Sequence, residues 1–332
     1  MTLNNRYRAM LFDTPGEIPV VIGFLPAVWM KYREQMHELT TSFPHLFSAA
    51  DRDKNDYDAV TGKYVEGNHI DAWGCVWSNV IPGMTSIVTG HPLSRRSDIQ
   101  LLEIPKEDEG LPHGFMFLRL ADLRGFEEIM LDFAEEPPEL QMLIDKVLTY
   151  NLRQAALKLS GIKEKGQIIY FGDDLGMQHA LPISPNLWRK YLIPCFKEIF
   201  KIFIDAGHYV YFHSDGHMIE IIPDLIDCGI SVINPQSGAN GIANIAAVCK
   251  GKVCVDIDLD RQLFPFASKL QLEEHVHEAV EKLYTPQGGL WIIAAIDQGV
   301  PFENIRTICE LLTKYRHYPE LSGSNQESQK NK

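Results

Sequence analysis

The second half of the chain alternates short apolar segments with longer segments of helical periodicity, and this alternation limits the fold more than any other feature. The apolar segments are rich in β-branched and aromatic residues, as in "QIIYF" (167–171), whereas the segments between them repeat apolar residues at helical spacing. Strands that alternate with helices pair in parallel through right-handed crossovers. Five strand–helix units follow one another: 167–171 with 184–207, 209–213 with 218–229, 231–235 with 242–251, 253–258 with 269–285, and 290–295 with 301–315.

Upstream segments extend the same pattern. Residues 19–24 and 115–120 are further strand candidates, and 124–159 is typical of two helices broken at a Pro-Pro pair. Seven or eight strands in a chain of 332 residues favour an α/β fold, specifically a single-domain (β/α)8 barrel over residues 1–318. A doubly wound open sheet is the alternative, but no G-x-G-x-x-G motif follows any of these strands.

Two segments depart from the repeat. Residues 51–113 are polar and rich in turn residues, so we interpret them as an inserted loop or small hairpin that covers one end of the barrel like a lid. Residues 319–332 are polar and lack apolar periodicity, which is typical of a disordered tail.

Charge and cysteine content exclude several classes of function. Lys and Arg number 31 against 44 Asp and Glu, a net charge of −13, which disfavours nucleic-acid binding. No apolar run approaches the roughly 18 residues that span a bilayer, and the N-terminus lacks the pattern of a secretion signal. The six cysteines are scattered without a C-x-x-C pair, as in reduced cytoplasmic proteins. We expect a soluble, acidic cytoplasmic protein; the sequence leaves open whether it forms a homodimer.

Polar side chains follow all five predicted strands in the second half. In a β/α barrel the carboxyl ends of the strands converge on one cavity, where active sites form. A single Asp-Gly or Asp-Asp motif is common in turns and helix caps, and Asp215 is also a candidate cap for a helix beginning near Met218. Five polar strand ends in a row favour an enzyme site instead. The strand ends carry Asp173, Asp174 and Gln178; His213 and Asp215; Asn234 and Gln236; Asp256, Asp258 and Arg261; and Asp297.

Three stretches of this sequence resemble the uroporphyrinogen decarboxylase-like superfamily. They are "DAWGCVW" with a later "GHPL", "GDDLGMQHALPISPNLWRKYLIP", and "FHSDGHMIEIIPDLIDCGISVINPQ". The superfamily consists of β/α barrels that include the haem-pathway decarboxylase and the methyltransferase components of corrinoid-dependent systems. The resemblance covers most of the chain, from about residue 19 to residue 316.

Two departures from the superfamily patterns bear on the reaction. The decarboxylase carries an early Arg-Gln-x-Gly-Arg stretch that holds the substrate carboxylates, whereas this sequence offers only Lys31 and Arg33 in "GFLPAVWMKYREQM". Members that activate a thiol use a zinc site of His-x-Cys plus a later Cys. Here Asp215 stands where the first cysteine would be, and no sulfur lies near Ala294 or Ala295.

The resemblance and these departures together imply a methyltransferase that moves a methyl group from a small O- or N-methyl substrate to a corrinoid on a partner protein. His213, Asp215, Asp173 and Asp174 are the expected catalytic residues. His213 and Asp215 are also candidate zinc ligands, because a Lewis acid or a proton donor must assist the departing heteroatom. Expected substrate-binding residues are Trp73 and Trp77 as an aromatic lid, Gln178, Asn234, Gln236, Asp256, Asp258 and Arg261.

Two rival interpretations stay open. The first is a decarboxylase of the uroporphyrinogen decarboxylase type that acts on a tetrapyrrole or a smaller acid; it requires two or more arginines in the cavity, and Arg119 and Arg261 are the main candidates. The second is a non-catalytic binding protein, in which the strand-end carboxylates neutralise one another or pair with lysine and arginine.

Overall fold

The structure is a computed structural model that describes residues 3–318, and its contacts divide the chain into two units. Within the described residues, unit 1 consists of 3–65, 81–85 and 235–318, and unit 2 consists of 66–80 and 86–234. The tail predicted at 319–332 lies outside the described residues.

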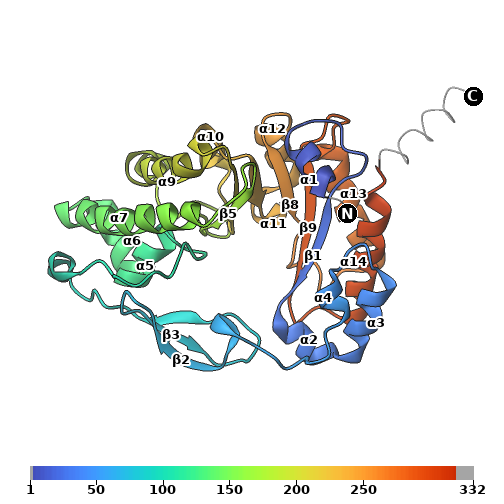
Figure 1. The fold of residues 1–332 in the computed structure, drawn as a ribbon, viewed down its shortest axis with the longest axis horizontal. Coiled ribbons are helices and arrows are strands. Elements are labelled where there is room, and N and C mark those ends of the chain that lie inside the picture. Colours follow the sequence, from blue (N-terminus) through green and yellow to red (C-terminus); the bar gives the residue numbers. More distant parts are fainter. Residues whose placement is uncertain (1–2, 319–332) are drawn as a thin grey trace, which may run out of the picture. The chain divides into compact units, whose positions relative to one another are not determined.

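Unit 1 contains three parallel strands, and β9 (Leu290–Ile296) lies between β1 (Val20–Phe24) and β8 (Cys254–Asp258). Val20 pairs with Ile292 on one side of β9, and Val255 pairs with Leu290 on the other. Apart from Asp256 and Asp258 on β8, the strands are apolar, and they are mostly buried, as expected for parallel strands covered by helices. The other elements of unit 1 are α1 (Leu3–Met10), α2 (Pro26–Tyr32), α3 (Glu34–Ser42), α4 (Ala49–Arg52), η1 (Gly62–Tyr64), α11 (Ser237–Asn240), α12 (Ile242–Cys249), α13 (Lys269–Leu283) and α14 (Phe302–Tyr315) (Figure 1).

Unit 2 contains the parallel strands β5 (Ile168–Gly172), β6 (Tyr209–Ser214) and β7 (Val232–Pro235, whose last residue is the first of unit 1), with β6 in the middle. The register pairs Gly172 with His213, so β5 and β6 end at the same level. The long helix α7 packs against α9 in this unit (Figure 1). Its helices are η2 (Arg96–Leu101), α5 (Phe117–Arg124), α6 (Phe126–Glu135), α7 (Pro138–Ser160), α8 (Pro185–Leu187), η3 (Trp188–Leu192), α9 (Ile193–Asp205), η4 (Ile219–Ile221) and α10 (Ile222–Asp227).

The helix predicted at 184–207 is confirmed, and it contains one irregular turn. The residues of η3 form a π-helical turn between α8 and α9. Pro194 follows directly at the start of α9 and has no N–H to donate to the preceding turn, so the normal helical hydrogen-bond ladder is interrupted there.

The segment predicted as an insertion folds partly as an antiparallel sheet. β3 (Val76–Asn79) pairs with β2 (Gly67–Ile70) on one side and with β4 (Ile87–Gly90) on the other. The hairpin expected within 51–113 is therefore present. Its function as a lid over a barrel stays a prediction.

The prediction of a strand at 115–120 is wrong, because residues 117–120 form the first part of α5. A short apolar run does not distinguish a buried strand from a buried helix. Here the carboxylate of Asp173 accepts hydrogen bonds from the backbone N–H groups of Met116, Phe117 and Leu118, at 2.6–3.0 Å. These donors stand at the start of α5, where a helix has no internal acceptors for them. A tertiary contact therefore selects the helix.

The parallel strands of the described residues number six, three in each unit, so the α/β class is confirmed and the expected eight-stranded barrel is not. All five strand–helix units predicted in the second half are present within two or three residues of their expected bounds. No helix of residues 3–318 combines the length and the apolar character that a membrane crossing requires.

Candidate active site at the strand ends of unit 2

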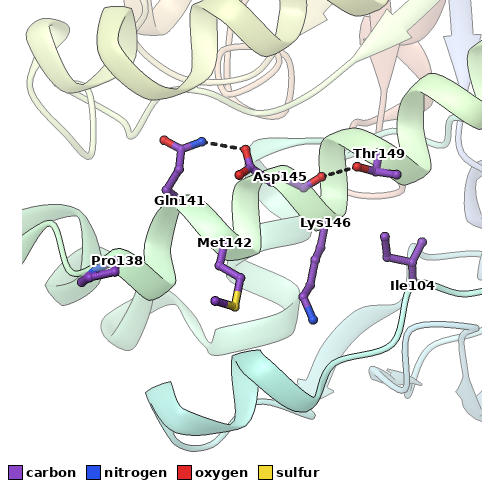
Figure 2. A pocket seen from close by; sticks show the side chains of 7 residues that line it. All are labelled: Ile104, Pro138, Gln141, Met142, Asp145, Lys146 and Thr149. Carbon is purple, nitrogen blue, oxygen red and sulfur yellow. Dashed lines mark hydrogen bonds between the residues drawn. The ribbon is translucent and has the colours of Figure 1, made fainter.

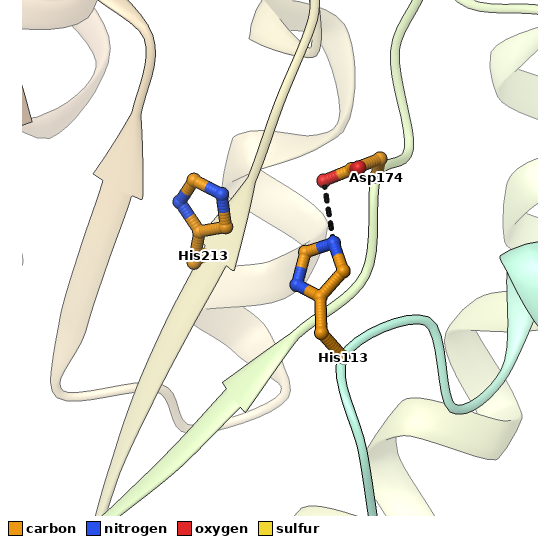
Figure 3. A group of neighbouring side chains, drawn as sticks. All are labelled: His113, Asp174 and His213. Atoms are coloured by element: carbon orange, nitrogen blue, oxygen red, sulfur yellow. Dashed lines mark ion pairs between the residues drawn. The ribbon is translucent and has the colours of Figure 1, made fainter. Parts of the chain in front are cut away.

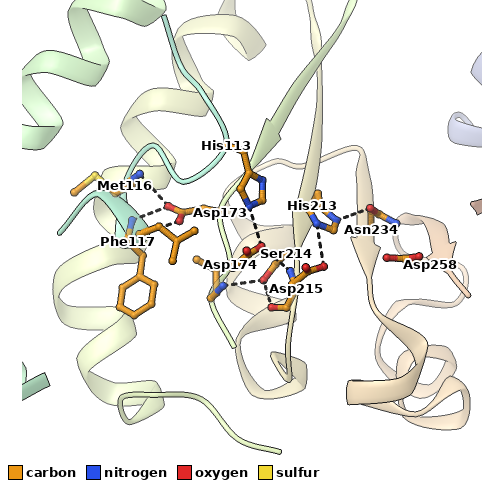
Figure 4. A network of polar contacts seen from close by, with 12 residues as sticks. His113, Met116, Phe117, Asp173, Asp174, His213, Ser214, Asp215, Asn234 and Asp258 are labelled. Atoms are coloured by element: carbon orange, nitrogen blue, oxygen red, sulfur yellow. Dashed lines mark hydrogen bonds and ion pairs between the residues drawn. The ribbon is translucent and has the colours of Figure 1, made fainter. Parts of the chain in front are cut away.

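The polar residues at the carboxyl ends of β5, β6 and β7 lie together in unit 2. Asp173 and Asp174 follow β5, while His213 and Asn234 belong to the last residues of β6 and β7. Because β5 and β6 pair in parallel with Gly172 opposite His213, the two strands deliver their polar residues to one place (Figure 4). This is the end of a parallel sheet at which α/β proteins form binding sites.

The imidazole of His213 is held by a partner on each ring nitrogen. Its Nδ1 lies 2.6 Å from Oδ1 of Asn234, and its Nε2 lies 3.2 Å from Oδ1 of Asp215. The His213 side chain is 22% exposed and that of Asp215 is 35% exposed, so both are accessible to a small molecule. A histidine oriented by an amide on one side and a carboxylate on the other can transfer a proton or bind a metal ion.

Asp215 does not occupy the N-cap position of the following helix. That helix begins with η4 at Ile219, and its N-cap residue is Met218, with no side-chain cap hydrogen bond. The side chain of Asp215 contacts His213. His217 in the same segment forms an ion pair with Glu220 at 3.0 Å.

His113 belongs to this cluster, and the sequence interpretation missed it. It lies in the segment before α5, and its Nε2 is 3.0 Å from Oδ1 of Asp174. Its ring centroid is 5.6 Å from that of His213. Figure 3 shows His113, Asp174 and His213 side by side; ligand atoms of all three lie within 4.8 Å of one another. The sequence gives only a weak indication that His113 belongs to the site, namely a His-Gly pair directly before an apolar run.

The side chains of Asp173 and Asp174 point in different directions and have different contacts. Asp173 is fully buried and accepts the three backbone hydrogen bonds that start α5. Burial raises the pKa of its carboxyl to about 6, although those hydrogen bonds and His113 oppose the shift. These contacts make Asp173 a positioning group for the segment that carries His113, whereas Asp174 faces His113 directly.

Backbone contacts join the loops that follow β5 and β6. Asp215 N–H donates to Oδ1 of Asp174 at 3.0 Å, and Leu175 N–H donates to the Ser214 hydroxyl at 2.9 Å. Gly176 and Gly216 pass so closely that a Cβ on either would lie 2.2–2.3 Å from backbone atoms of the other loop. Side chains other than hydrogen do not fit at this crossing, so the two loops are held in one fixed arrangement.

Three further residues of unit 2 are predicted to bind substrate, namely Trp73, Trp77 and Gln178. Trp73 is 4% exposed and packs edge-on against Tyr150, with ring centroids 5.1 Å apart. Trp77 on β3 stacks on His69 and donates its indole N–H to Asp71. Gln178 is exposed after β5. The contacts of both tryptophans are those of packing within unit 2.

The remaining predicted residues belong to unit 1. Asp256 and Asp258 on β8 are 2% and 3% exposed, and Asp258 forms an ion pair with Arg261 at 2.6 Å. Gln236 and Asp258 form a parallel bridge. The Asp258–Arg261 pair is the structural arrangement that the sequence left as an alternative.

Arg119, a candidate for binding substrate carboxylates, is paired within unit 2. It is 6% exposed, and its guanidinium donates to Oδ2 of Asp71 at 2.5 Å. The N–H groups of Trp77, Trp73 and Cys75 also donate to Asp71. Arg119 and Asp71 thus join α5 to the segment between β2 and β3.

The cysteines offer no thiolate. All six are buried and unbonded to one another. Burial raises the pKa of Cys75, Cys195, Cys249 and Cys309 to about 12 and that of Cys228 to about 11, and it also raises the pKa of Cys254 well above its usual value. They are small core residues, and no sulfur chemistry is available at the strand ends.

A separate depression of about 390 Å³ lies along α7 (Figure 2). Its walls are aliphatic and polar side chains without a histidine or cysteine, and Lys146 donates to the carbonyl of Leu102. Its Asp145 is also paired within the chain, because the Gln141 amide donates to its Oδ1 at 2.8 Å. It is lined by Ile104, Pro138, Gln141, Met142, Asp145, Lys146 and Thr149.

The chain combines parallel strands, covering helices and a histidine–carboxylate cluster at the strand ends. This combination is typical of α/β enzymes whose active sites lie at the carboxyl ends of their strands. The chain belongs to the uroporphyrinogen decarboxylase (URO-D) family, whose model matches residues 118–315, more than half of the chain. This family comprises enzymes, and the match confirms the resemblance expected from the sequence.

Among solved structures, the chain is similar in fold to a methyltransferase from Methanosarcina mazei, with a TM-score of 0.65 and 18% sequence identity. The similarity covers 95% of this chain and 99% of the methyltransferase. At this identity it shows the fold. No curated protein matches the sequence.

Proposed function

We propose that this protein is a methyltransferase that moves a methyl group from the oxygen or nitrogen of a small methylated substrate to a corrinoid carried by a partner protein. One observation carries the proposal. His213, oriented by Asn234 and Asp215, lies beside the His113–Asp174 pair at the strand ends, in a site of nitrogen and oxygen groups without sulfur. Such groups assist a departing heteroatom, whereas family members that activate a thiol rely on cysteine.

The corrinoid, when bound, supplies the electron pair that forms the new bond to the methyl carbon. The residues of this chain act on the other product. When the bond between the methyl carbon and a substrate oxygen breaks, the oxygen keeps the electron pair and needs a proton or a cation, because alkoxides leave poorly. Nε2 of His213 is the group that donates this proton, and Asp215 at 3.2 Å stabilises the protonated ring.

Decarboxylation is the second candidate, because the family model is that of uroporphyrinogen decarboxylase. The arginines that the sequence offered for substrate carboxylates do not favour it. Arg119 is paired with Asp71 and Arg261 with Asp258. Both guanidinium groups therefore already neutralise a carboxylate of this chain.

The test uses free cob(I)alamin as the methyl acceptor and a panel of aromatic methyl ethers and methylamines. Formation of methylcobalamin is followed by absorbance, and carbon dioxide release is measured from uroporphyrinogen and from small aromatic acids. We expect methyl transfer by the wild type, loss of at least 100-fold in His213→Ala, and wild-type rates in His217→Ala, a histidine paired with Glu220 in the same segment. Carbon dioxide release that depends on His213, without methyl transfer, would overturn the proposal in favour of decarboxylation.

A further inference from the structure

We propose that His113, Asp174 and His213 bind one divalent metal ion of the zinc type, with His113 as a ligand from outside the strand-end sequence motifs. His113 lies in the segment before α5, Asp174 lies two residues after the end of β5, and His213 lies on β6. Their ligand atoms lie within 4.8 Å of one another (Figure 3). In this form of the site the ion replaces the His213 proton as the group that assists the departing heteroatom. That use rests on the proposed function, whereas metal binding itself is measured without turnover.

The fold holds these ligands in place before any ion binds. Gly114 N–H donates to the carbonyl of Gly172 at 2.8 Å, which fixes the backbone beside His113. Gly172 also makes room for the ring, because a Cβ there would lie 2.4 Å from Nδ1 of His113. On the other side, Oδ1 of Asp174 accepts the N–H of Asp215. Ligands whose orientations are fixed by such contacts are the usual basis of a metal site.

The contact between Asn234 and His213 determines which ring nitrogen faces the site. The oxygen of an amide only accepts hydrogen bonds, so Nδ1 of His213, 2.6 Å from Oδ1 of Asn234, carries a proton. In the neutral ring Nε2 then has a lone pair. That lone pair faces the carboxylate of Asp215 at 3.2 Å, and two acceptors repel each other unless a proton or a metal cation lies between them. Histidine ligands in metal sites commonly show this pattern, with the second nitrogen bonded to an oxygen of the protein.

The set of ligands indicates the metal. Two imidazoles and one carboxylate leave at least one position open for water or substrate, which is the composition of catalytic zinc sites. Metal–ligand distances of about 2.0–2.1 Å place ligand atoms roughly 3.4 Å apart in a tetrahedron, so side-chain rotations that bring these atoms closer than their present limit of 4.8 Å complete the site. Soft thiolate ligands are absent from the described cluster, which disfavours copper(I).

The sequence interpretation paired His213 with Asp215 as ligands, and the geometry changes that set. His113 and Asp174 join His213, while Asp215 stands beside Nε2 as a second carboxylate next to the ion. The cluster side chains are 22–37% exposed, so an ion can enter from solvent.

The experiment is zinc binding to the full chain. The purified protein is stripped with a chelator, dialysed, and titrated with ZnCl2 by calorimetry, with bound zinc counted by elemental analysis. Cobalt(II) is added to a second sample, and its visible absorption reports nitrogen and oxygen ligation. We expect one ion per chain, and at least a 100-fold loss of affinity in His113→Ala, Asp174→Asn and His213→Ala. His217→Ala, which removes the histidine of the His217–Glu220 pair, is the matched control and should bind like the wild type.

Circular dichroism and thermal melting of each variant separate lost ligands from lost folding. Because Asp174→Asn keeps the shape of the side chain, it tests ligation even if an alanine variant fails to fold. Stoichiometric binding that is unchanged in His113→Ala and Asp174→Asn would overturn the ligand set, and a wild type that binds no zinc at micromolar concentration would overturn the site. A chain that binds zinc through these residues but transfers no methyl group would overturn only the proposed function.

Discussion

Nδ1 of His213 and Oδ1 of Asn234 lie 2.6 Å apart, and this contact fixes both the plane and the tautomer of the ring. His213 is the last but one residue of β6 and Asn234 the last but one of β7, so the contact joins two neighbouring strands of unit 2 at the point where the chemistry is proposed. Asn234 is 4% exposed, which shields the hydrogen bond from water. The orientation of His213 therefore depends on a residue that need not contact the substrate.

Replacing Asn234 should impair the site through His213. We expect Asn234→Leu to lower zinc affinity and methyl-transfer kcat/KM by about 10- to 100-fold, because the ring loses its orienting acceptor. Asn234→Asp keeps an oxygen in place and should recover most of the loss. Calorimetry and cob(I)alamin assays measure both. Equal defects in the two variants would indicate that the residue matters for packing and not for the tautomer.

A methyl group at Gly172 should displace His113. Its Cβ would lie 2.4 Å from Nδ1 of His113, and the ring is the end of a flexible side chain that can swing away. We expect Gly172→Ala to fold normally and to bind zinc about 10-fold or more weakly. Titration of the folded variant with ZnCl2 checks this. In the double variant with His113→Ala the glycine substitution should have no further effect, since the displaced ring is already gone.

Asp132 should be the most costly charged residue of unit 2 to remove. It is fully buried on α6 and accepts from Nε of Arg96 at 2.8 Å and from Nε of Arg124 at 2.9 Å. Because Asp132→Ala leaves the buried Arg124 without this partner, we expect about 3–5 kcal/mol less free energy of unfolding in urea. Asp205→Ala breaks the exposed pair with Lys201 and should change it by under about 1 kcal/mol. Similar losses in both would contradict the role of burial.

The stability of the protein should depend on Asp122 between pH 4 and pH 6. Burial raises the pKa of this carboxyl from 3.8 to about 6; Arg119 opposes the shift and Asp71 adds to it. The folded protein thus keeps a proton that the unfolded chain releases, so the folded state loses stability as pH rises through this range.

Asp122→Asn removes that ionisation. We expect its free energy of unfolding to exceed that of the wild type by up to about 3 kcal/mol at pH 7, with the difference shrinking toward pH 4. Urea unfolding of both proteins at pH 4.5, 5.5 and 7 measures the difference. A difference independent of pH would show that Asp122 does not titrate in this range.

The sequence predicted the strand–helix alternation of residues 167–315 because each element there has the periodicity and the flanking residues of its class. Because those strand positions predict a shared strand-end site, the sequence also predicts that His213, Asp174 and Asn234 lie close together, and the structure brings them together. The prediction failed at 115–120, where local pattern was ambiguous and the carboxylate of Asp173, distant in sequence, decided the outcome.

His113 could not be predicted for a related reason. It ends no strand, and its place in the cluster depends on a missing side chain at Gly172 and on a backbone hydrogen bond from Gly114. Neither leaves a periodic signal in the sequence. The aromatic lid of Trp73 and Trp77 stays a prediction; within unit 2, Trp73 packs against Tyr150 and Trp77 donates to Asp71.

The segment that carries His113 lies before residue 118, where the match to the family model begins. The assignment of this chain to the family therefore does not rest on His113. The proposed metal site draws one of its three ligands from outside the matched region, beside the glycine that ends β5.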